Sequence, residues 1–468
     1  MNRKIKILYI AAEISPYASS GGLGEVGRSF PSALLEMAEV EVTRVMPLHK
    51  AVSSKMNYVT DFPVSMEPGF ETCVLKKDAD NKEIATYFIG NDRYFCRDNI
   101  YGYEDDGFRY FFFCRAVVEM LKRIAYQPDI IHLNDWHTGF LALLIKKEFP
   151  KIKTVYTIHN ISYQGYIPAS FLEGILSESE LCQLGWPQWL NFMKAGIIYS
   201  DFLTTVSSGY CREIRQPEFS CGMSFYIEQR TNDMVGILDG IDTDCYDPGH
   251  DGILTYPYNE GNTSQKQKNR TELRLAYGLP NTHVPLIAMI TRLEYSKGIE
   301  IVLSALKRMD MNTFQLFILG TGNPYYQGLL AGIAAEYPDS IIADFNYTSS
   351  SAKKIYGAAD IYLMPSQNEP CGLGQLYAMR YGAVPIVNPV GGLKCTVIED
   401  KDDWKKSSGF YMEEWSEESL AIALKRAIKT YHTLDWENYI INCMRFDSSW
   451  KSSVSEYLAL YKKMLMGS

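Results

Sequence analysis

The sequence lacks any cysteine pair at the spacing used by metal sites, because its ten cysteines are scattered and none forms a CxxC motif. We therefore expect no metal and no disulfide framework, and this usage fits a reducing cytoplasm. The chain also lacks a basic block, and its formal net charge is -9. That balance argues against a nucleic-acid or anionic-membrane partner. No apolar run approaches the roughly 20 residues of a membrane helix, so we expect a soluble protein.

Length and periodicity predict two α/β domains. The chain has 468 residues, more than one core comfortably holds. Apolar, β-branched runs alternate with helical stretches, which is typical of βαβ units in a parallel sheet. The first of these runs, residues 5–11, is too short for a signal peptide and leads straight into Glu13 and a Gly-rich loop. The other segments of this rhythm are residues 26–35, 130–133, 139–148, 154–158, 202–206, 286–291, 298–307, 314–319, 327–336 and 341–345.

A polar stretch separates the two halves. Residues 239–269 are rich in Gly, Pro, Asp, Asn and Ser, which is typical of a domain boundary. We predict two Rossmann-like, doubly wound domains that face each other across a cleft, residues 1–245 and 246–447, with closing helices that include residues 448–468. Ligands of such sheets bind beyond the carboxyl ends of the strands.

The most informative segment follows an apolar strand of the second half. Glu369 stands in the loop after this strand, and a helix opens at Gly372, Leu373, Gly374 and Gln375. Unpaired backbone N–H groups and the helix dipole attract an anion there. We interpret Glu369 as facing a sugar beside a bound diphosphate. Taken alone, the segment also fits an ordinary strand, loop and helix.

Two cations follow another strand of the second half. Arg292 and Lys297 stand in a loop that Gly298 closes. A departing diphosphate gains negative charge in the transition state, and preorganised cations stabilise that charge. Solvated surface charges are the alternative for any isolated Arg/Lys pair.

Loops of the first half place polar groups directly after strands. Gly21 and Gly22 open the first helix, where they allow backbone N–H groups to approach an anion, although an isolated Gly-Gly equally fits a tight turn. Asp135, His159 and Asn160 follow later strands. The spacing of the histidines, which include His132 and His137, does not fit a metal site. For these segments we favour hydrogen bonding to a polyhydroxylated ligand.

Taken in order, the motifs resemble those of bacterial glycogen synthases and plant starch synthases over nearly the whole chain. These are retaining glucosyltransferases of the GT-B fold that extend α-1,4-glucans from a nucleoside diphosphate glucose. The matching motifs are Asn134-Asp-Trp-His-Thr-Gly, Thr157-Ile-His-Asn, Tyr163-Gln-Gly, Asn191-Phe-Met-Lys-Ala-Gly, Gly236-Ile-Leu-Asp-Gly-Ile-Asp, Glu369-Pro-Cys-Gly-Leu and Ala378-Met-Arg-Tyr-Gly.

The resemblance implies a function for individual residues. Arg292 and Lys297 would hold the diphosphate, while Glu369, His159 and Asp135 would surround the glucosyl unit. Tyr347 would stack on the base, at roughly 1 to 3 kcal/mol if it resembles stacking elsewhere. The donor would be ADP-glucose and the acceptor glycogen or a maltooligosaccharide, with no cofactor. The remaining residues implied to bind the donor are Gly21, Gly22, Asn160, Asp239, Gly372, Leu373, Gly374 and Gln375.

Five positions near the implied donor site depart from the family pattern. Ser19 stands where the family has Lys, and Glu25 where it has Asp. Asp239 replaces Asn and is expected to introduce a formal charge, Gly374 replaces Thr, and Cys395 replaces Asp. The loss of a lysine should weaken phosphate binding unless another cation substitutes. These departures leave three hypotheses: an ADP-glucose-dependent glucan synthase, a catalytically weak glucan-binding or regulatory relative, and a GT-B transferase with another sugar-nucleotide donor or acceptor.

Overall fold

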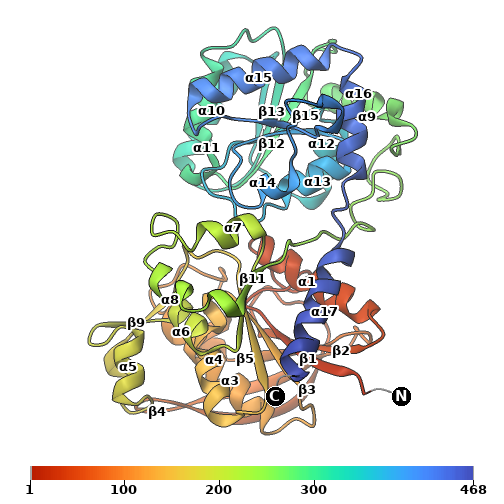
Figure 1. The fold of residues 1–468 in the computed structure, drawn as a ribbon. Helices are drawn as coiled ribbons and strands as arrows, with labels where there is room; N and C mark the ends of the chain where they lie inside the picture. The colour runs from red at the N-terminus through yellow and green to blue at the C-terminus, as the bar shows by residue number, and fades with distance from the viewer. Residues whose placement is uncertain (1–2, 467–468) are drawn as a thin grey trace. The chain divides into compact units, whose positions relative to one another are not determined.

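The computed structural model describes residues 3–466, which form two compact units. Unit 1 holds the described residues up to Gly240 and from Trp450 onward, and unit 2 spans Ile241–Ser449. Figure 1 gives the labels used below. Both units are α/β layers around a mainly parallel sheet, so the prediction of two Rossmann-like domains is confirmed.

Unit 1 is built on a nine-stranded sheet in the order β11-β10-β7-β6-β1-β2-β5-β4-β3. Its central strands are parallel and buried on both faces, which explains their continuous apolar sequences. The strands are β1 (Ile5–Ile10), β2 (Val40–Pro47), β3 (Met56–Met66), β4 (Gly69–Asp78), β5 (Ala85–Gly90), β6 (Ile130–Asn134), β7 (Lys153–Ile158), β10 (Phe202–Thr205) and β11 (Met234–Gly236). A separate two-stranded sheet pairs β8 (Tyr166–Pro168) with β9 (Trp189–Asn191).

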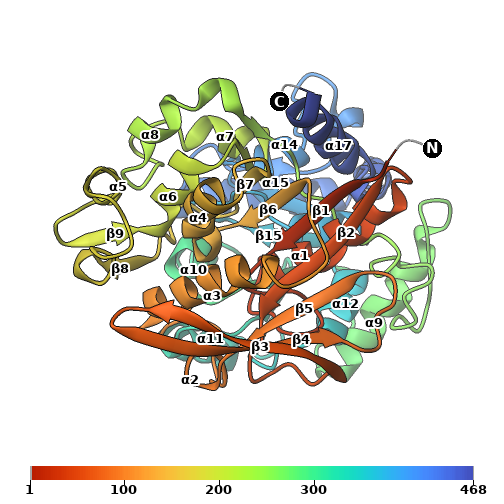
Figure 2. The same cartoon turned by 90° about the horizontal axis from the view of Figure 1, so that it is seen from below.

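The antiparallel part of this sheet was not predicted from the sequence. β3 and β4 form a long hairpin, and β4 pairs antiparallel with β5. Figure 2 shows this hairpin along one border of unit 1. Because one face of the hairpin meets solvent, its sequence alternates apolar and polar residues and does not form an apolar run.

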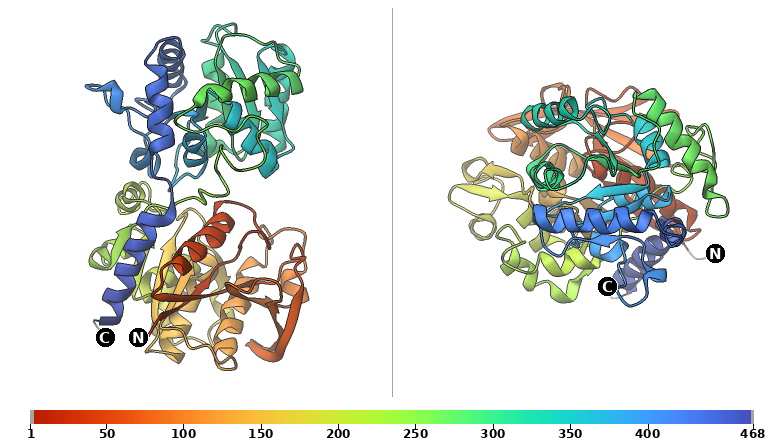
Figure 3. Two further views of the ribbon diagram at one scale, coloured as in Figure 1. Left: turned by 90° about the vertical axis from the view of Figure 1, so that its right-hand side faces the viewer. Right: turned by 90° about the horizontal axis from the view of Figure 1, so that it is seen from above.

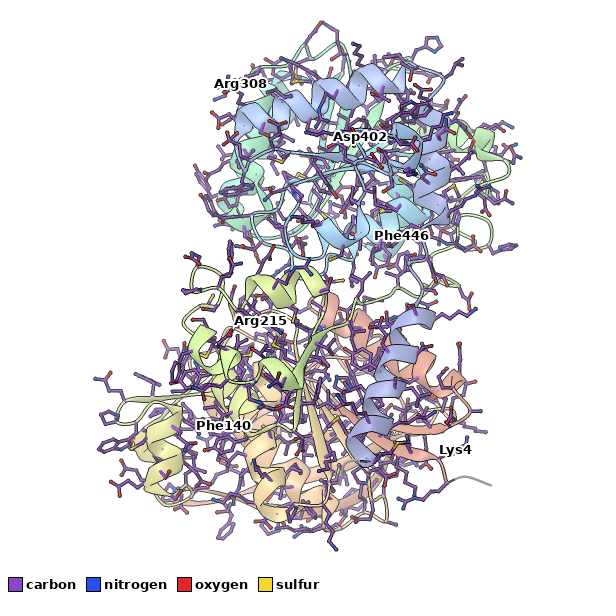
Figure 4. The ribbon with its side chains drawn as sticks, in the orientation of Figure 1. Lys4, Phe140, Arg215, Arg308, Asp402 and Phe446 are labelled. Carbon is purple, nitrogen blue, oxygen red and sulfur yellow. The ribbon has the colours of Figure 1, made fainter. Side chains whose placement is uncertain are left out.

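Helices cover the sheet of unit 1 and pack by apolar faces. Phe140 of α4 is fully buried and is labelled within unit 1 in Figure 4. The helices are α1 (Gly22–Glu36), α2 (Asp92–Phe95), α3 (Asp106–Leu121), α4 (Gly139–Glu148), α5 (Glu178–Leu184), α6 (Phe192–Tyr199), α7 (Ser208–Glu213), α8 (Ser224–Glu228) and the C-terminal α17 (Trp450–Met466).

Helix α17 packs beside α1 although some 420 residues separate them along the chain. The indole Nε1 of Trp450 donates to Ser29 Oγ at 2.8 Å, and the Tyr461 hydroxyl bonds His132 Nδ1 at 2.7 Å. Figure 3 shows α17 in dark blue along the first-unit elements. Tertiary contacts therefore attach the C-terminal helix to unit 1.

Unit 2 is built on a fully parallel six-stranded sheet in the order β14-β13-β12-β15-β16-β17. The strands are β12 (Leu286–Ile290), β13 (Gln315–Leu319), β14 (Ile341–Asp344), β15 (Ile361–Met364), β16 (Val384–Val387) and β17 (Phe410–Tyr411). The helices are α9 (Lys266–Ala276), α10 (Ile299–Leu306), α11 (Pro324–Glu336), α12 (Ser349–Ala358), α13 (Gly374–Arg380), α14 (Leu393–Thr396), α15 (Glu417–Tyr431) and α16 (Trp436–Arg445).

Helices α9, α12 and α14 of unit 2 were not predicted from the sequence. The polar end of the predicted boundary stretch is helical, because α9 begins at Lys266. The Lys266 ammonium is buried and donates to the carbonyl oxygens of Tyr356, Gly357 and Tyr381. These hydrogen bonds compensate the burial of the Lys266 ammonium, although the polar composition of this stretch predicts that it is exposed to solvent. Helix α16 was not predicted. No helix of the described chain is long and apolar enough to cross a membrane.

Candidate functional site

The Gly-rich loop of unit 1 is organised by a buried carboxylate. Glu13 follows β1, is 3% exposed, and accepts hydrogen bonds from the backbone N–H groups of Ser20 and Gly21 and, at 2.7 Å, from the Tyr101 hydroxyl. Burial raises the pKa of the Glu13 carboxyl. Gly21 and Gly22 begin α1, and a Cβ at Gly21 would meet open space. Part of the predicted anion-binding loop is therefore occupied by an internal carboxylate.

The two substituted positions of this loop make local hydrogen bonds. The Ser19 hydroxyl donates to Gly21 O at 3.2 Å. Glu25 accepts from Ser15 Oγ at 2.9 Å and lies 3.4 Å from the Arg28 guanidinium. The serine thus holds the loop without supplying the charge of the lysine that the family pattern has there.

Asp135 holds the loop that carries His159 and Asn160. Its Oδ1 accepts the backbone N–H of His159 at 2.8 Å and that of Asn160 at 3.2 Å. Asp135 has φ 56° and ψ −179°, a conformation normally confined to glycine. Burial raises the pKa of its carboxyl to about 7. A strained, buried carboxylate at a strand end is typical of a functional site.

His159 is held as a neutral imidazole. Its Nε2 lies 3.0 Å from Asn134 Oδ1, and burial lowers its pKa to about 3. His137 lies nearby, stacked on Tyr101 at 4.7 Å between ring centroids. Within the described chain, neither ring nitrogen of His137 has a hydrogen-bond partner although the residue is buried. Neutral imidazoles suit hydrogen bonding to hydroxyl groups better than binding of anions.

Two polar residues of unit 1, His132 and Asp239, are buried. His132 is a core histidine, because its two ring nitrogens bond the hydroxyls of Tyr461 and Thr157 at 2.7 and 2.6 Å. Asp239, which the sequence analysis expects to add a formal charge, is buried, and desolvation together with the nearby Asp135 raises the pKa of its carboxyl well above the usual value. Burial therefore favours the uncharged acid.

Unit 2 brings the predicted cation and carboxylate of two loops together. The Lys297 ammonium lies 2.6 Å from Glu369 Oε2, and the side chains are 15% and 10% exposed. Ser366 Oγ donates to the same oxygen at 2.9 Å. Gly298 has φ 76° and packs on Pro365, where a Cβ would lie 2.5 Å from the Pro365 carbonyl oxygen. The loops that follow β12 and β15 therefore form one rigid structure.

Arg292 stands at the other end of the same loop. Its Nη1 bonds Glu294 Oε1 at 2.8 Å, and its side chain is 49% exposed. The guanidinium is therefore accessible to solvent, and its exposed pair with Glu294 is weak enough for another anion to compete. Arg292 and Lys297 lie in one loop but in different environments.

The Gly372–Gln375 loop begins α13 as predicted. Gly372 has φ 73°, and Gln375 is fully buried with its Nε2 donating to Gly372 O at 2.6 Å and Thr396 Oγ1 at 3.2 Å. A Cβ at Gly374 would lie 2.4 Å from the Tyr362 hydroxyl. In this chain, that hydroxyl occupies space that a larger side chain at position 374 would need.

The remaining predicted residues of unit 2 lie at the same edge of the sheet. Tyr347 follows β14 and is 52% exposed. Cys395 lies in α14, and its Sγ donates to Gly391 O at 3.6 Å. The structure thus places an exposed aromatic ring beside the carboxyl end of a parallel strand, where ligands of such sheets bind.

Two residues at the Gly-rich loop of unit 1, Glu13 and Tyr101, were not predicted from the sequence as part of the site. Glu13 had a signal, because it directly follows the first strand at the Gly-rich loop. Tyr101 had none, because its contact with Glu13 joins residues 88 positions apart.

No cluster within residues 3–466 has the three His, Cys, Asp or Glu side chains that a metal ion needs. All ten cysteines are free thiols.

Two family models match the chain in succession. Residues 6–229 match the starch synthase catalytic domain, and residues 272–440 match glycosyl transferases group 1. The glycogen synthase of Moorella thermoacetica is 36% identical over 99% of this chain and 98% of the relative. A Clostridium botulinum glycogen synthase is 34% identical over 98% of this chain and 99% of the relative.

Solved structures also resemble this chain. The catalytic domain of starch synthase IV from Arabidopsis thaliana, bound to ADP and acarbose, matches with a TM-score of 0.92 and 30% identity, over 99% of this chain and 100% of that chain. A sucrose-phosphate synthase from Thermosynechococcus elongatus has a TM-score of 0.66 at 17% identity, with 99% and 100% covered, which shows the fold alone. The chain therefore belongs to the glycogen and starch synthase family of glycosyltransferases.

Proposed function

We propose that the protein transfers glucose, with retention of configuration, from ADP-glucose to the non-reducing end of an α-1,4-glucan. The observation that carries this proposal is the Lys297–Glu369 pair, which joins two loops at the carboxyl edge of the second sheet. Family membership supports the reaction class, and the ADP in the starch synthase IV structure supports the choice of donor.

Unit 2 binds the nucleotide and its diphosphate. Arg292 and Lys297 neutralise the diphosphate, and the backbone N–H groups of residues 372–375 bind its oxygens. Tyr347 stacks on the base through its exposed ring. Glu369, held by Lys297 and Ser366, accepts hydrogen bonds from glucose hydroxyls.

Unit 1 binds the glucosyl unit and the glucan. His159 and Asn160 present polar groups from the loop that Asp135 holds in place. Gly21 and Gly22 bring backbone N–H groups to the donor, and Asp239, whose carboxyl pKa is raised by burial, stands where the family pattern has Asn. This assignment corresponds to residues 1–245 as acceptor domain and 246–447 as nucleotide domain, with residues 448–468 returning to the first.

The reaction needs no protein nucleophile. The C1–O bond to the diphosphate breaks as the acceptor 4-hydroxyl attacks C1 from the same face, through an oxocarbenium-like state. The acceptor proton passes to the departing diphosphate, whose growing charge the two cations stabilise. We propose that these groups carry the reaction without a cofactor, and the free thiols support a cytoplasmic location.

To test this proposal, purified protein is incubated with glycogen and with labelled ADP-glucose, UDP-glucose or GDP-glucose in separate reactions. The label bound to the polymer is then measured. We expect the highest rate with ADP-glucose and α-1,4 linkage of the product. A higher rate with another nucleotide would correct the donor.

A second candidate is a catalytically weak, glucan-binding relative, which the replacement of the loop lysine by Ser19 favours. Retention on glycogen without incorporation from any of the three donors would support this candidate and refute the proposed enzyme.

A further inference from the structure

Arg292, one of the two cations in the loop after β12, is paired with a carboxylate of the same loop. Its Nη1 bonds Glu294 Oε1 at 2.8 Å. Within residues 3–466 the Glu294 carboxylate has no further hydrogen bond or ion pair, and its side chain is 37% exposed. The guanidinium that we assign to the diphosphate therefore already has an anionic neighbour.

The backbone fixes the two side chains of this pair on one face. Leu293 lies between them, is fully buried, and donates its N–H to Thr321 O at 2.8 Å. It also forms a parallel bridge with Gly322. Glu294 has φ −135° and ψ 156°, which is extended backbone. Because residues i and i+2 of an extended chain point to the same side, Arg292 and Glu294 lie together, opposite the buried Leu293.

The partner of the other cation is held differently. Glu369 is bonded by both Lys297 and Ser366, and the side chains of the Lys297–Glu369 pair are only 15% and 10% exposed. Glu294 has one partner and faces solvent, and an exposed ion pair contributes little to stability. A bound diphosphate can therefore displace the Glu294 carboxylate from Arg292, but the displaced carboxylate remains in the same short loop.

The charge of a ligand at this loop decides how strongly Glu294 opposes its binding. In ADP-glucose the terminal phosphate is esterified, whereas in free ADP it undergoes a second ionisation at about pH 6. At neutral pH, ADP therefore carries about one more negative charge than ADP-glucose. Coulomb repulsion from a neighbouring carboxylate increases with the charge of the ligand. Glu294 should thus oppose the nucleotide product more strongly than the donor.

We propose that Glu294 is a specificity-determining residue that discriminates the sugar-nucleotide donor from the nucleoside diphosphate product. Its carboxylate weakens the binding of ADP more than that of ADP-glucose, so the product leaves and does not block the next turnover. The identities of donor and product rest on the proposed function. Glu294 takes no part in bond breaking, because it acts only through its charge beside Arg292.

The test measures the dissociation constants of ADP and of ADP-glucose by calorimetry, for the wild type and for Glu294→Gln. Glucan is left out, so that transfer does not consume the donor. Loss of the carboxylate should lower the dissociation constant about tenfold for ADP and about threefold for ADP-glucose, which shifts their ratio about threefold. The shift should shrink at high salt, because added ions screen exposed charges.

Transfer assays give a second measure of the same discrimination. In Glu294→Gln, the ratio of the inhibition constant of ADP to the KM for ADP-glucose should fall by the same factor. The matched control is Glu417→Gln, which removes the carboxylate of another exposed pair of unit 2, with Arg308 at 3.4 Å and side chains 50% and 44% exposed. It should leave both ratios unchanged.

A further variant separates charge from geometry. Glu294→Asp keeps the charge and should keep a ratio near that of the wild type, whereas Glu294→Thr removes the charge and should behave like Glu294→Gln. An unchanged ratio in both neutral variants would overturn the proposal. Weaker ADP binding in these variants would also overturn it, because Glu294 would then serve to position Arg292 for the ligand.

Failure of the proposed function gives a different pattern. If no donor supports transfer but calorimetry shows the expected shift in ratio, the discrimination by Glu294 stands and the enzymatic proposal falls. If ADP-glucose supports transfer and the neutral variants keep the wild-type ratio, the inference about Glu294 falls alone. Absence of measurable binding of both nucleotides to the wild type would overturn both.

Discussion

Replacing Lys297 by alanine removes the ammonium that lies 2.6 Å from Glu369 in unit 2. The Glu369 carboxylate bonds the side chains of Lys297 and Ser366. After the substitution it keeps the 2.9 Å hydrogen bond from Ser366. In our proposal the same ammonium also stabilises the departing diphosphate. The substitution therefore tests a structural and a chemical contribution at once, and the two must be measured separately.

The structure sets the expected magnitudes. Loss of one preorganised group that meets developing charge costs about 2.7–4 kcal/mol, which lowers kcat about 10²–10³-fold. The side chains of the pair are 15% and 10% exposed, so the remaining carboxylate is largely desolvated. Breaking a fully buried pair costs about 3–5 kcal/mol. Because Ser366 still donates, we expect the lower cost of a charged hydrogen bond, about 1.5–3 kcal/mol in unfolding free energy.

Initial rates of label transfer from ADP-glucose to glycogen give the first quantity, and urea unfolding gives the second. The matched control is Arg308→Ala, which removes a charge from an exposed pair with Glu417 at 3.4 Å. Figure 4 labels Arg308 at the surface of unit 2. It should change stability by less than about 1 kcal/mol and leave the rate unchanged.

A Lys297→Ala protein that is folded and turns over within about threefold of the wild-type rate would refute the assigned contribution. A rate loss matched by the fraction unfolded under assay conditions would also refute it, because the defect would then be structural. Adding Glu369→Gln to Lys297→Ala should restore part of the lost stability, since the uncompensated charge is removed, without restoring kcat.

The other predictions concern pH, packing and the C-terminal helix. Burial raises the pKa of the Asp135 carboxyl to about 7, so the folded state binds its proton more tightly than the unfolded state does. Deprotonation of Asp135 therefore lowers the unfolding free energy of the wild type as pH rises from about 4 to 7. Over that range the unfolding free energy of Asp135→Asn should rise by about 4 kcal/mol relative to wild type, measured by urea unfolding at each pH. Gly374→Thr should cost about 1–3 kcal/mol because of the Tyr362 hydroxyl, and Tyr362→Phe in the same chain should recover most of it; additive costs in the double-variant melts would contradict this packing. Tyr461→Phe should cost about 1–3 kcal/mol by leaving His132 Nδ1 unpaired, with kcat unchanged; an unaltered thermal midpoint would show that the bond contributes nothing.

Parallel strands such as β12 and β13 were predictable because burial on both faces leaves continuous apolar runs. The parallel strand β2 was not predicted, because its sequence interrupts the apolar residues with Glu41, Thr43 and Arg44. The β3–β4 hairpin was missed because it is exposed on one face and alternates. Helix α9 was not predicted, and its first residue, Lys266, is a charged side chain whose burial depends on carbonyl oxygens distant in sequence. Local periodicity reports how many faces of an element are covered, and it carries no information on what covers them.

The residues of the candidate site were indicated by the sequence, whereas their distances and pKa values were not. Arg292, Lys297 and Glu369 were recognisable because each follows a predicted strand, and the carboxyl ends of parallel strands meet at one edge. The distance between Lys297 and Glu369 was not predictable, since it depends on how two loops 72 residues apart pack. The raised pKa of the Asp239 carboxyl was not predictable either, because its first cause is burial, which the sequence does not report.

The sequence by itself determined the family, the two α/β domains and which strand ends carry reactive side chains, because these depend on residue order and local burial patterns. Tertiary structure alone decided the partners: Glu13 with the Gly-rich loop, the Tyr362 hydroxyl beside Gly374, and Lys297 with Glu369. Such contacts arise between segments that chain order does not relate. Their strength depends on desolvation and distance, which exist only once the chain has folded.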